Sequence, residues 1–210
     1  MADIPPSKTN TVTAGQIGKI QELLGTALRK YKAELPRRAV QNVLEAQADS
    51  LAKELLATVR ERVEQVTNMF VKRVTVDGEK SNQEMLNATR RTQYVDEAVV
   101  ASMPRREAGE TIVYFFNLDL DRCISISDRE LEKEYEKHGF VPASPYILAA
   151  VNAEDPEFAD EHPNSTHWRN KSGNWCFALF HSCEGERELD VNCLEHEWDG
   201  RWWFAGVRPQ

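Results

Sequence analysis

The stretch that decides the fold is NWCFALFHSCEGERELDVNCLEHEWDGRWWFAGVR, residues 174–208. It holds four of the five tryptophans and three of the four cysteines. Asp199-Gly200 lies between two apolar runs and is typical of a two-residue hairpin loop, because a type I′ turn needs positive φ at both central residues. The segment therefore predicts a small antiparallel β-meander that ends at the C-terminus.

The last strand of this segment is apolar on both faces. Alternation along a strand puts Trp203, Ala205 and Val207 on one face and Trp202 and Phe204 on the other. A strand that is apolar on both faces is normally covered on both. The alternative is that one aromatic face is an exposed platform, which makes Trp202, Trp203 and Phe204 the candidate binding residues for a partner.

The N-terminal third has the pattern of a helical arm. We expect a disordered lead over residues 1–13 and a helical hairpin over residues 14–75, broken at Pro36. Apolar residues of the first helix recur every three or four positions from Ile17 to Tyr31. Those of the second continue for thirty residues, at Val40, Leu44, Ala48, Leu51, Leu55, Val59, Val63, Val66 and Phe70.

The second helix is expected to be long. Its mean apolar spacing of about 3.75 residues differs from the 3.5 of a left-handed coiled coil. Roughly 34 helical residues span about 50 Å, which exceeds the width of a domain of about 135 residues. Part of the row of apolar residues on this helix therefore extends beyond the domain and must pack against something else. Either the hairpin folds back on itself, or it pairs with a second copy in a homo-oligomer.

The charge distribution bears on nucleic-acid binding. Lys and Arg outnumber Asp and Glu by 12 to 8 over residues 1–75, and are outnumbered by 14 to 26 over residues 76–210. Phosphate contacts need Lys and Arg, so the acidic part is not expected to bind nucleic acid. Five basic residues lie around the bend between the two helices of the arm, and nucleic-acid binding by the arm is therefore an alternative function. They are Arg29, Lys30, Lys32, Arg37 and Arg38.

Composition predicts an ordinary globular protein, with 41% hydrophobic and 29% charged residues. No apolar run reaches the roughly 18 residues of a membrane helix, and the N-terminus lacks the features of a secretory signal. We therefore expect a cytoplasmic protein with no membrane association and with reduced thiols.

Residues 76–210 are expected to form a compact domain of short helices and strands. Capping-box spacings at Ser81/Glu84 and Ser127/Glu130 predict two helices, and Pro145 is placed to open a third. The β-branched and aromatic run Thr111–Leu118 predicts a strand. The predicted fold class is α+β: an N-terminal helical hairpin, then a domain with a small, mainly antiparallel sheet.

The cysteines and histidines near the C-terminus raise the question of zinc. Cys193 and His196 have the spacing of a ligand pair, but strand alternation puts Cys176 and His181 on opposite faces of one strand and His196 opposite Cys193 on the next. These groups do not converge without a bulge. We therefore expect buried structural cysteines, no metal and no cofactor.

A second polar group includes Asp160, His162 and His167, which together could supply a general acid and base or a hard-metal site. Helix-capping carboxylates and surface histidines are the structural alternative. No glycine-rich phosphate loop, dinucleotide fingerprint, nucleophile elbow or zinc-protease motif is present in the sequence. These three residues are the candidate catalytic residues of an enzyme alternative.

The order of features from Thr111 onward resembles a family of uncharacterised bacterial and mobile-element proteins. The resemblance rests on Gly139-Phe140-Val141-Pro142-Ala143, the helix residues Ile147–Ala150 and the terminal strand Trp202–Arg208. The order is also distantly similar to C-type-lectin-like domains, without their calcium-binding motifs. The resemblance implies a bacterial protein and assigns no activity and no functional residue.

Taken together, these features favour a non-catalytic interaction or assembly protein. It would oligomerise through its N-terminal helices and present the α+β domain to a partner.

Overall fold

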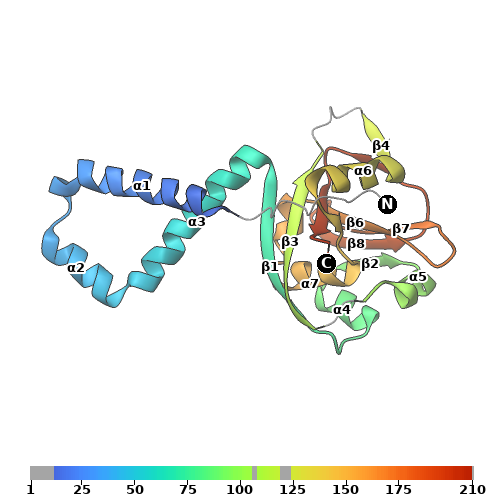
Figure 1. Ribbon diagram of the computed structural model, residues 1–210. Helices are drawn as coiled ribbons and strands as arrows, with labels where there is room; N and C mark the ends of the chain where they lie inside the picture. Colours follow the sequence, from blue (N-terminus) through green and yellow to red (C-terminus); the bar gives the residue numbers. More distant parts are fainter. Residues whose placement is uncertain (1–11, 106–107, 119–123, 210) are drawn as a thin grey trace. The chain divides into compact units, whose positions relative to one another are not determined.

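The computed structural model describes residues 12–105, 108–118 and 124–209 of the chain (Figure 1). The chain divides into two compact units, residues 1–59 and residues 60–210. Each unit is described by itself.

The first unit is helical. It contains α1 (Ala14–Lys30), the short 3₁₀ helix η1 (Lys32–Glu34), α2 (Arg37–Ala46) and most of α3 (Ala48–Thr67). Thr13 caps α1 in a capping box with Gln16. Most of the predicted lead, residues 1–11, lies outside the described residues.

The prediction of one long helix from Arg37 to Phe70 is wrong. The helix is interrupted at Gln47 (φ −136°), between α2 and α3, and no proline or glycine stands at this break to explain it. It ends before Asn68, whose positive φ of 49° is the left-handed conformation that asparagine tolerates. Phe70 belongs to β1 (Met69–Val76), because the β-branched run that follows Asn68 pairs with another strand.

The second unit is built on a mixed eight-stranded sheet. Its order is β1, β3 (Gly109–Asn117), β10 (Trp203–Val207), β6 (Asn164–Arg169), β7 (Trp175–Cys183), β8 (Glu186–Asn192) and β2 (Thr92–Val95). The short β5 (Val141–Pro142) also pairs with β10. The pairs β10–β6 and β2–β8 are parallel and the others are antiparallel. The α+β class is confirmed, whereas the sheet is larger and more mixed than predicted.

The predicted hairpin at Asp199-Gly200 is wrong. Among the described glycines, positive φ occurs at positions 109, 139, 173 and 185 and not at 200. The tight turn lies instead at Glu184 (φ 51°) and Gly185 (φ 87°), between the paired strands β7 and β8. β6, β7 and β8 form an antiparallel meander, but β10 does not continue it.

The last strand instead inserts between β3 and β6. Its two apolar faces explain this position, because a central strand is covered on both sides. The segment before it, β9 (Glu197–Asp199), pairs with β4 (Ser125–Ser127) in a separate two-stranded sheet.

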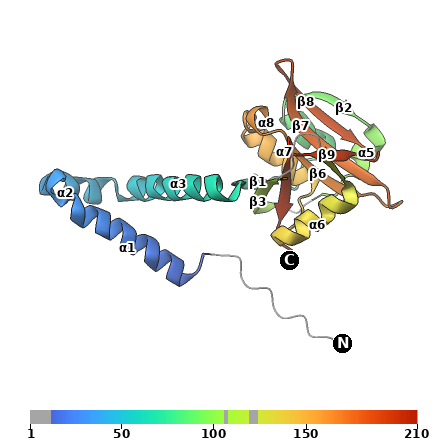
Figure 2. The same ribbon diagram turned by 90° about the horizontal axis from the view of Figure 1, so that it is seen from above.

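Helices cover both faces of the large sheet (Figures 1 and 2). One face carries α7 (Pro145–Glu154) and the short helices α4 (Asn82–Ala88), α5 (Glu97–Ser102) and α8 (Phe158–Glu161). The other carries α6 (Asp128–His138) and the small sheet, over an aromatic core that includes Phe116, Tyr135, Phe177, Trp198 and Phe204. This aromatic layer positions the candidate site.

The predicted helix starts of this unit are confirmed. Ser81 and Ser127 close capping boxes with Glu84 and Glu130, and Pro145 opens α7. Gly139 ends α6 in the left-handed conformation, with φ 72°. No helix among the described residues combines the length and apolar character that crossing a membrane requires.

Candidate functional site

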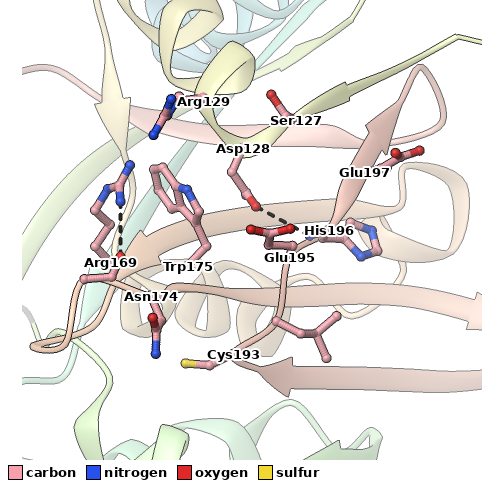
Figure 3. Close-up of a pocket in the computed structure, with 12 residues that line it drawn as sticks. Ser127, Asp128, Arg129, Arg169, Asn174, Trp175, Cys193, Glu195, His196 and Glu197 are labelled. Atoms are coloured by element: carbon pink, nitrogen blue, oxygen red, sulfur yellow. Dashed lines mark hydrogen bonds between the residues drawn. The ribbon is translucent and has the colours of Figure 1, made fainter.

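A cavity of about 790 Å³ opens beside the start of α6 (Figure 3). Three segments line it: residues 127–129 at the start of α6, the end of β6 with the turn into β7, and residues 193–197 after β8. These segments are far apart in the sequence and meet because β6, β7 and β8 are neighbours in the sheet.

The buried carboxylate of Asp128 forms one part of the cavity wall. The side chain is 5% exposed. One of its oxygens, Oδ1, lies 2.9 Å from His167 Nδ1 and accepts a hydrogen bond of 2.9 Å from Trp198 Nε1. The other oxygen, Oδ2, accepts a 3.5 Å hydrogen bond from the backbone N–H of His196. The carboxylate thus connects α6, β6 and β9.

The electrostatics of Asp128 favour its charged form. Burial by itself would raise the pKa of the carboxyl group, but the hydrogen bonds from His167 and Trp198 outweigh it and hold the pKa below its usual range. Asp128 is therefore ionised at neutral pH. His167 is fully buried, and its Nδ1 is the nitrogen that faces the carboxylate.

The ring of Trp175 contacts two polar or charged groups. It is stacked on the imidazole of His167, with centroids 4.6 Å apart and an angle of 10° between planes. The guanidinium carbon of Arg169 lies 3.9 Å from the ring centroid. The Arg169 guanidinium also donates a 3.1 Å hydrogen bond to the carbonyl of Gly173.

Residues 195–197 supply the opposite side of the cavity. Glu195 and Glu197 are exposed, and His196 between them is half-buried. Burial lowers the pKa of the His196 imidazole, and the negative charge of Asp128 only partly offsets this effect. His196 is therefore neutral at neutral pH.

The three predicted catalytic residues do not share a site. Asp160 pairs with Arg187 at 2.6 Å and with the buried Arg91 at 3.6 Å. The ring of His162 lies among the aromatic rings of Phe70, Phe158 and Trp203 on the α7 face of the sheet. His167 faces the opposite side of the sheet, where it meets Asp128 and Tyr135.

The predicted aromatic binding residues lie in the interior. Trp202 is 7% exposed and Phe204 is fully buried, both on the α6 face, while Trp203 is half-buried against the α7 face. The predicted distribution of these side chains between two faces is confirmed. With both faces of β10 covered, these residues form no exposed platform in the described structure.

The cysteine prediction needs a correction. Cys176 and Cys193 lie directly opposite each other on β7 and after β8, and they form a disulfide rather than free thiols. Cys183 is free and exposed. Within the described parts of the chain, no group of three or more His, Cys, Asp and Glu side chains is arranged to hold a metal ion.

Sequence reasoning missed the residues that the structure does bring together: Asp128, Trp175 and Trp198. Asp128 is the first residue of α6, after the capping residue Ser127, and an acidic residue in the first turn of a helix is an ordinary feature. His167 was expected near a loop or at the surface. Only its complete burial in β6 shows that it needs a buried hydrogen-bond partner.

Comparisons with known proteins identify no similar protein. No protein-family model matches the chain, and neither a curated protein nor a solved structure is significantly similar to it. The family resemblance described above stays an expectation.

Proposed function

We propose that the protein is a non-catalytic interaction and assembly protein. It self-associates through its N-terminal helices and presents the α+β domain to a partner. The observation that carries the proposal is the exposure of the apolar side chains of the helical unit.

None of the residues of α1 or α2 is buried. Large apolar side chains are nevertheless frequent on both helices and on α3. Leu23 is 60% exposed, Leu44 is 53% exposed and Leu56 is 58% exposed, and the same exposed set includes Ile17, Ile20, Leu24, Leu28, Leu35, Val40, Leu55 and Val63. Extended apolar surface of this kind marks an interaction site on a soluble protein.

The helices also need tertiary contacts in order to persist. An isolated helix of fewer than about 12–15 residues is marginal in water, and α2 has 10 residues. A second copy of the chain is the partner that this requirement favours, because every copy carries the same apolar surface and closed homo-oligomers are the common outcome.

The apolar positions of α3 favour an interface made by one helix face. Leu51, Leu55, Val59 and Val63 follow one another at intervals of four residues. Positions with this spacing lie along one side of a helix. Leu51 and Val59 are half-buried and Leu55 and Val63 are exposed.

Paired substitutions on α3 test the proposal. Leu51→Asp with Leu55→Asp places two charges on the apolar side, whereas Ser50→Asp with Ala57→Asp places two on the opposite side as a matched control. The first variant should sediment as a monomer and the control as an oligomer. Equal masses for the two variants would contradict self-association through this face.

A further inference from the structure

The cavity beside α6 has a division of charge that points to a ligand class. Figure 3 shows Arg129 and Arg169 at one end, and the carboxylates of Asp128, Glu195 and Glu197 toward the other, with Glu195 beside Asp128. We propose that this cavity binds a small zwitterion, a molecule carrying a carboxylate and a protonated amine, as free amino acids and short peptides do. The inference does not rest on self-association through the helical unit.

The cationic end is arranged in advance. The guanidinium of Arg169 is held by its 3.1 Å hydrogen bond to the carbonyl of Gly173 and by the ring of Trp175. Glu132 Oε2 lies 3.9 Å from one of its nitrogens, a long ion pair. Guanidinium groups form two parallel hydrogen bonds with a carboxylate, and a side chain that is already ordered loses less entropy on binding.

Arg129 adds a second cation to this end. It lies on the first turn of α6 and is exposed. Together with Arg169 it gives the ligand carboxylate two possible donors from different segments of the chain.

The anionic end suits an ammonium group, which offers three N–H donors. Asp128 is ionised and fixed by its hydrogen bonds to His167 and Trp198. Glu197 is oriented by Ser125, whose hydroxyl donates a 2.7 Å hydrogen bond to its carboxylate. The neutral His196 adds no positive charge that would repel the amine.

The size and charge of the cavity exclude simpler ligands. Its volume of about 790 Å³ lies within the range of roughly 300–1,000 Å³ that is usual for small-molecule sites. A bare anion at the arginine end would leave the negative charge of the three carboxylates unbalanced by any positive charge on the ligand. A metal ion would need a ligand cluster, and none is present among the described residues. A zwitterion satisfies both ends at once.

The test uses the full-length protein and three probes of increasing length: glycine, glycylglycine and triglycine. Binding is followed by the NMR signals of the tryptophan indole N–H groups, since Trp198 donates to Asp128 and Trp175 lines the cavity. At least one probe should shift these two signals in a saturable way, and the best probe shows whether the site takes an amino acid or a peptide.

Charge-neutralised forms of the best probe test the two ends separately. Removal of either charge, by N-acetylation or by C-amidation, should weaken binding by about tenfold or more, which corresponds to about 1.4 kcal/mol. Arg169→Gln should abolish the preference for the free carboxylate, and Glu195→Gln should reduce the preference for the free amine. Arg73→Gln, on an exposed arginine of β1, is the matched control and should change neither.

The inference is overturned if no probe shifts the indole signals up to about 10 mM, which is weaker than useful recognition. It is equally overturned if the neutralised probes bind as well as the parent. Arg169 and Glu195 are both exposed, so their variants are expected to fold. If Arg169→Gln lowers the melting temperature, Glu195→Gln alone decides the question.

Discussion

Replacing Asp128 with alanine removes the acceptor on which the aromatic layer under α6 depends. His167 and Trp198 are both fully buried, and each places a ring nitrogen 2.9 Å from the same carboxylate oxygen. Without the carboxylate, these two N–H groups are left in the core with no acceptor. An unsatisfied buried donor costs about 1–3 kcal/mol, so the variant should lose about 2–6 kcal/mol of unfolding free energy. That is a large part of the roughly 5–15 kcal/mol available to a domain.

The assay is urea unfolding, followed by tryptophan fluorescence and by circular dichroism. The midpoint should fall while the slope of free energy against urea stays constant, which is the sign of a pure change in stability. Asp96→Ala is the matched control. Asp96 likewise stands at the start of a helix and accepts hydrogen bonds, from two backbone N–H groups, but it is exposed. Loss of such a cap costs about 1 kcal/mol.

A double-mutant cycle isolates the contact between Asp128 and Trp198. Trp198→Phe removes the N–H but keeps most of the aromatic ring. In the Asp128→Ala background its additional cost should shrink, with a coupling energy of about 1 kcal/mol or more. An Asp128→Ala loss below about 1 kcal/mol, or a coupling energy near zero, would refute the network as a source of stability.

Three further predictions follow from burial and pairing. The free energy of unfolding should fall as the pH is lowered from 7 to 5. Burial lowers the pKa of His196, so the unfolded state takes up a proton more readily than the folded state. Unfolding free energies that rise toward pH 5 would argue against this. Alkylation in denaturant without reductant should leave Cys176 and Cys193 unmodified, and labelling of both would disprove their pairing. Trp202→Ala should cost about 3–5 kcal/mol and Trp203→Ala less, since Trp203 is only half-buried. Differential scanning calorimetry that ranks the two in the reverse order would contradict this difference in burial.

Local signals in the sequence predicted several helix starts of this protein correctly. The capping boxes at Ser81 and Ser127 and the proline at position 145 all mark helix starts that the structure contains. These signals work because the backbone groups at a helix end must be satisfied by nearby residues. Strand alternation likewise predicted which side chains of β7 and β10 share a face.

Strand pairing was not predictable from the same local signals. Asp199-Gly200 has the composition of a hairpin loop, but the strands on either side pair elsewhere, β9 with β4 and β10 with β3 and β6. Glu184-Gly185 forms the tight turn instead. Both faces of β10 are apolar, so the strand buries more apolar surface at the centre of the sheet than it would in a hairpin at the edge. The stabilisation from this burial outweighs the preference of Asp199-Gly200 for a hairpin turn.

The candidate site was predictable only in part. His167 was identified, but its partner Asp128 is 39 residues earlier in the chain and was not. Asp160 and His162 are close to His167 in sequence and have different surroundings in the fold. Proximity along the chain predicts a shared site poorly where a strand intervenes, because successive side chains of the strand point to opposite faces of the sheet.

The most direct test of the central claim is the mass of the intact protein in solution. Sedimentation equilibrium of the full 210-residue chain at micromolar concentrations should give a multiple of the 24.0 kDa chain mass, because in the proposed assembly a second copy covers the exposed apolar side chains of α1, α2 and α3. A mass of 24.0 kDa that does not change with concentration would contradict assembly through the N-terminal helices.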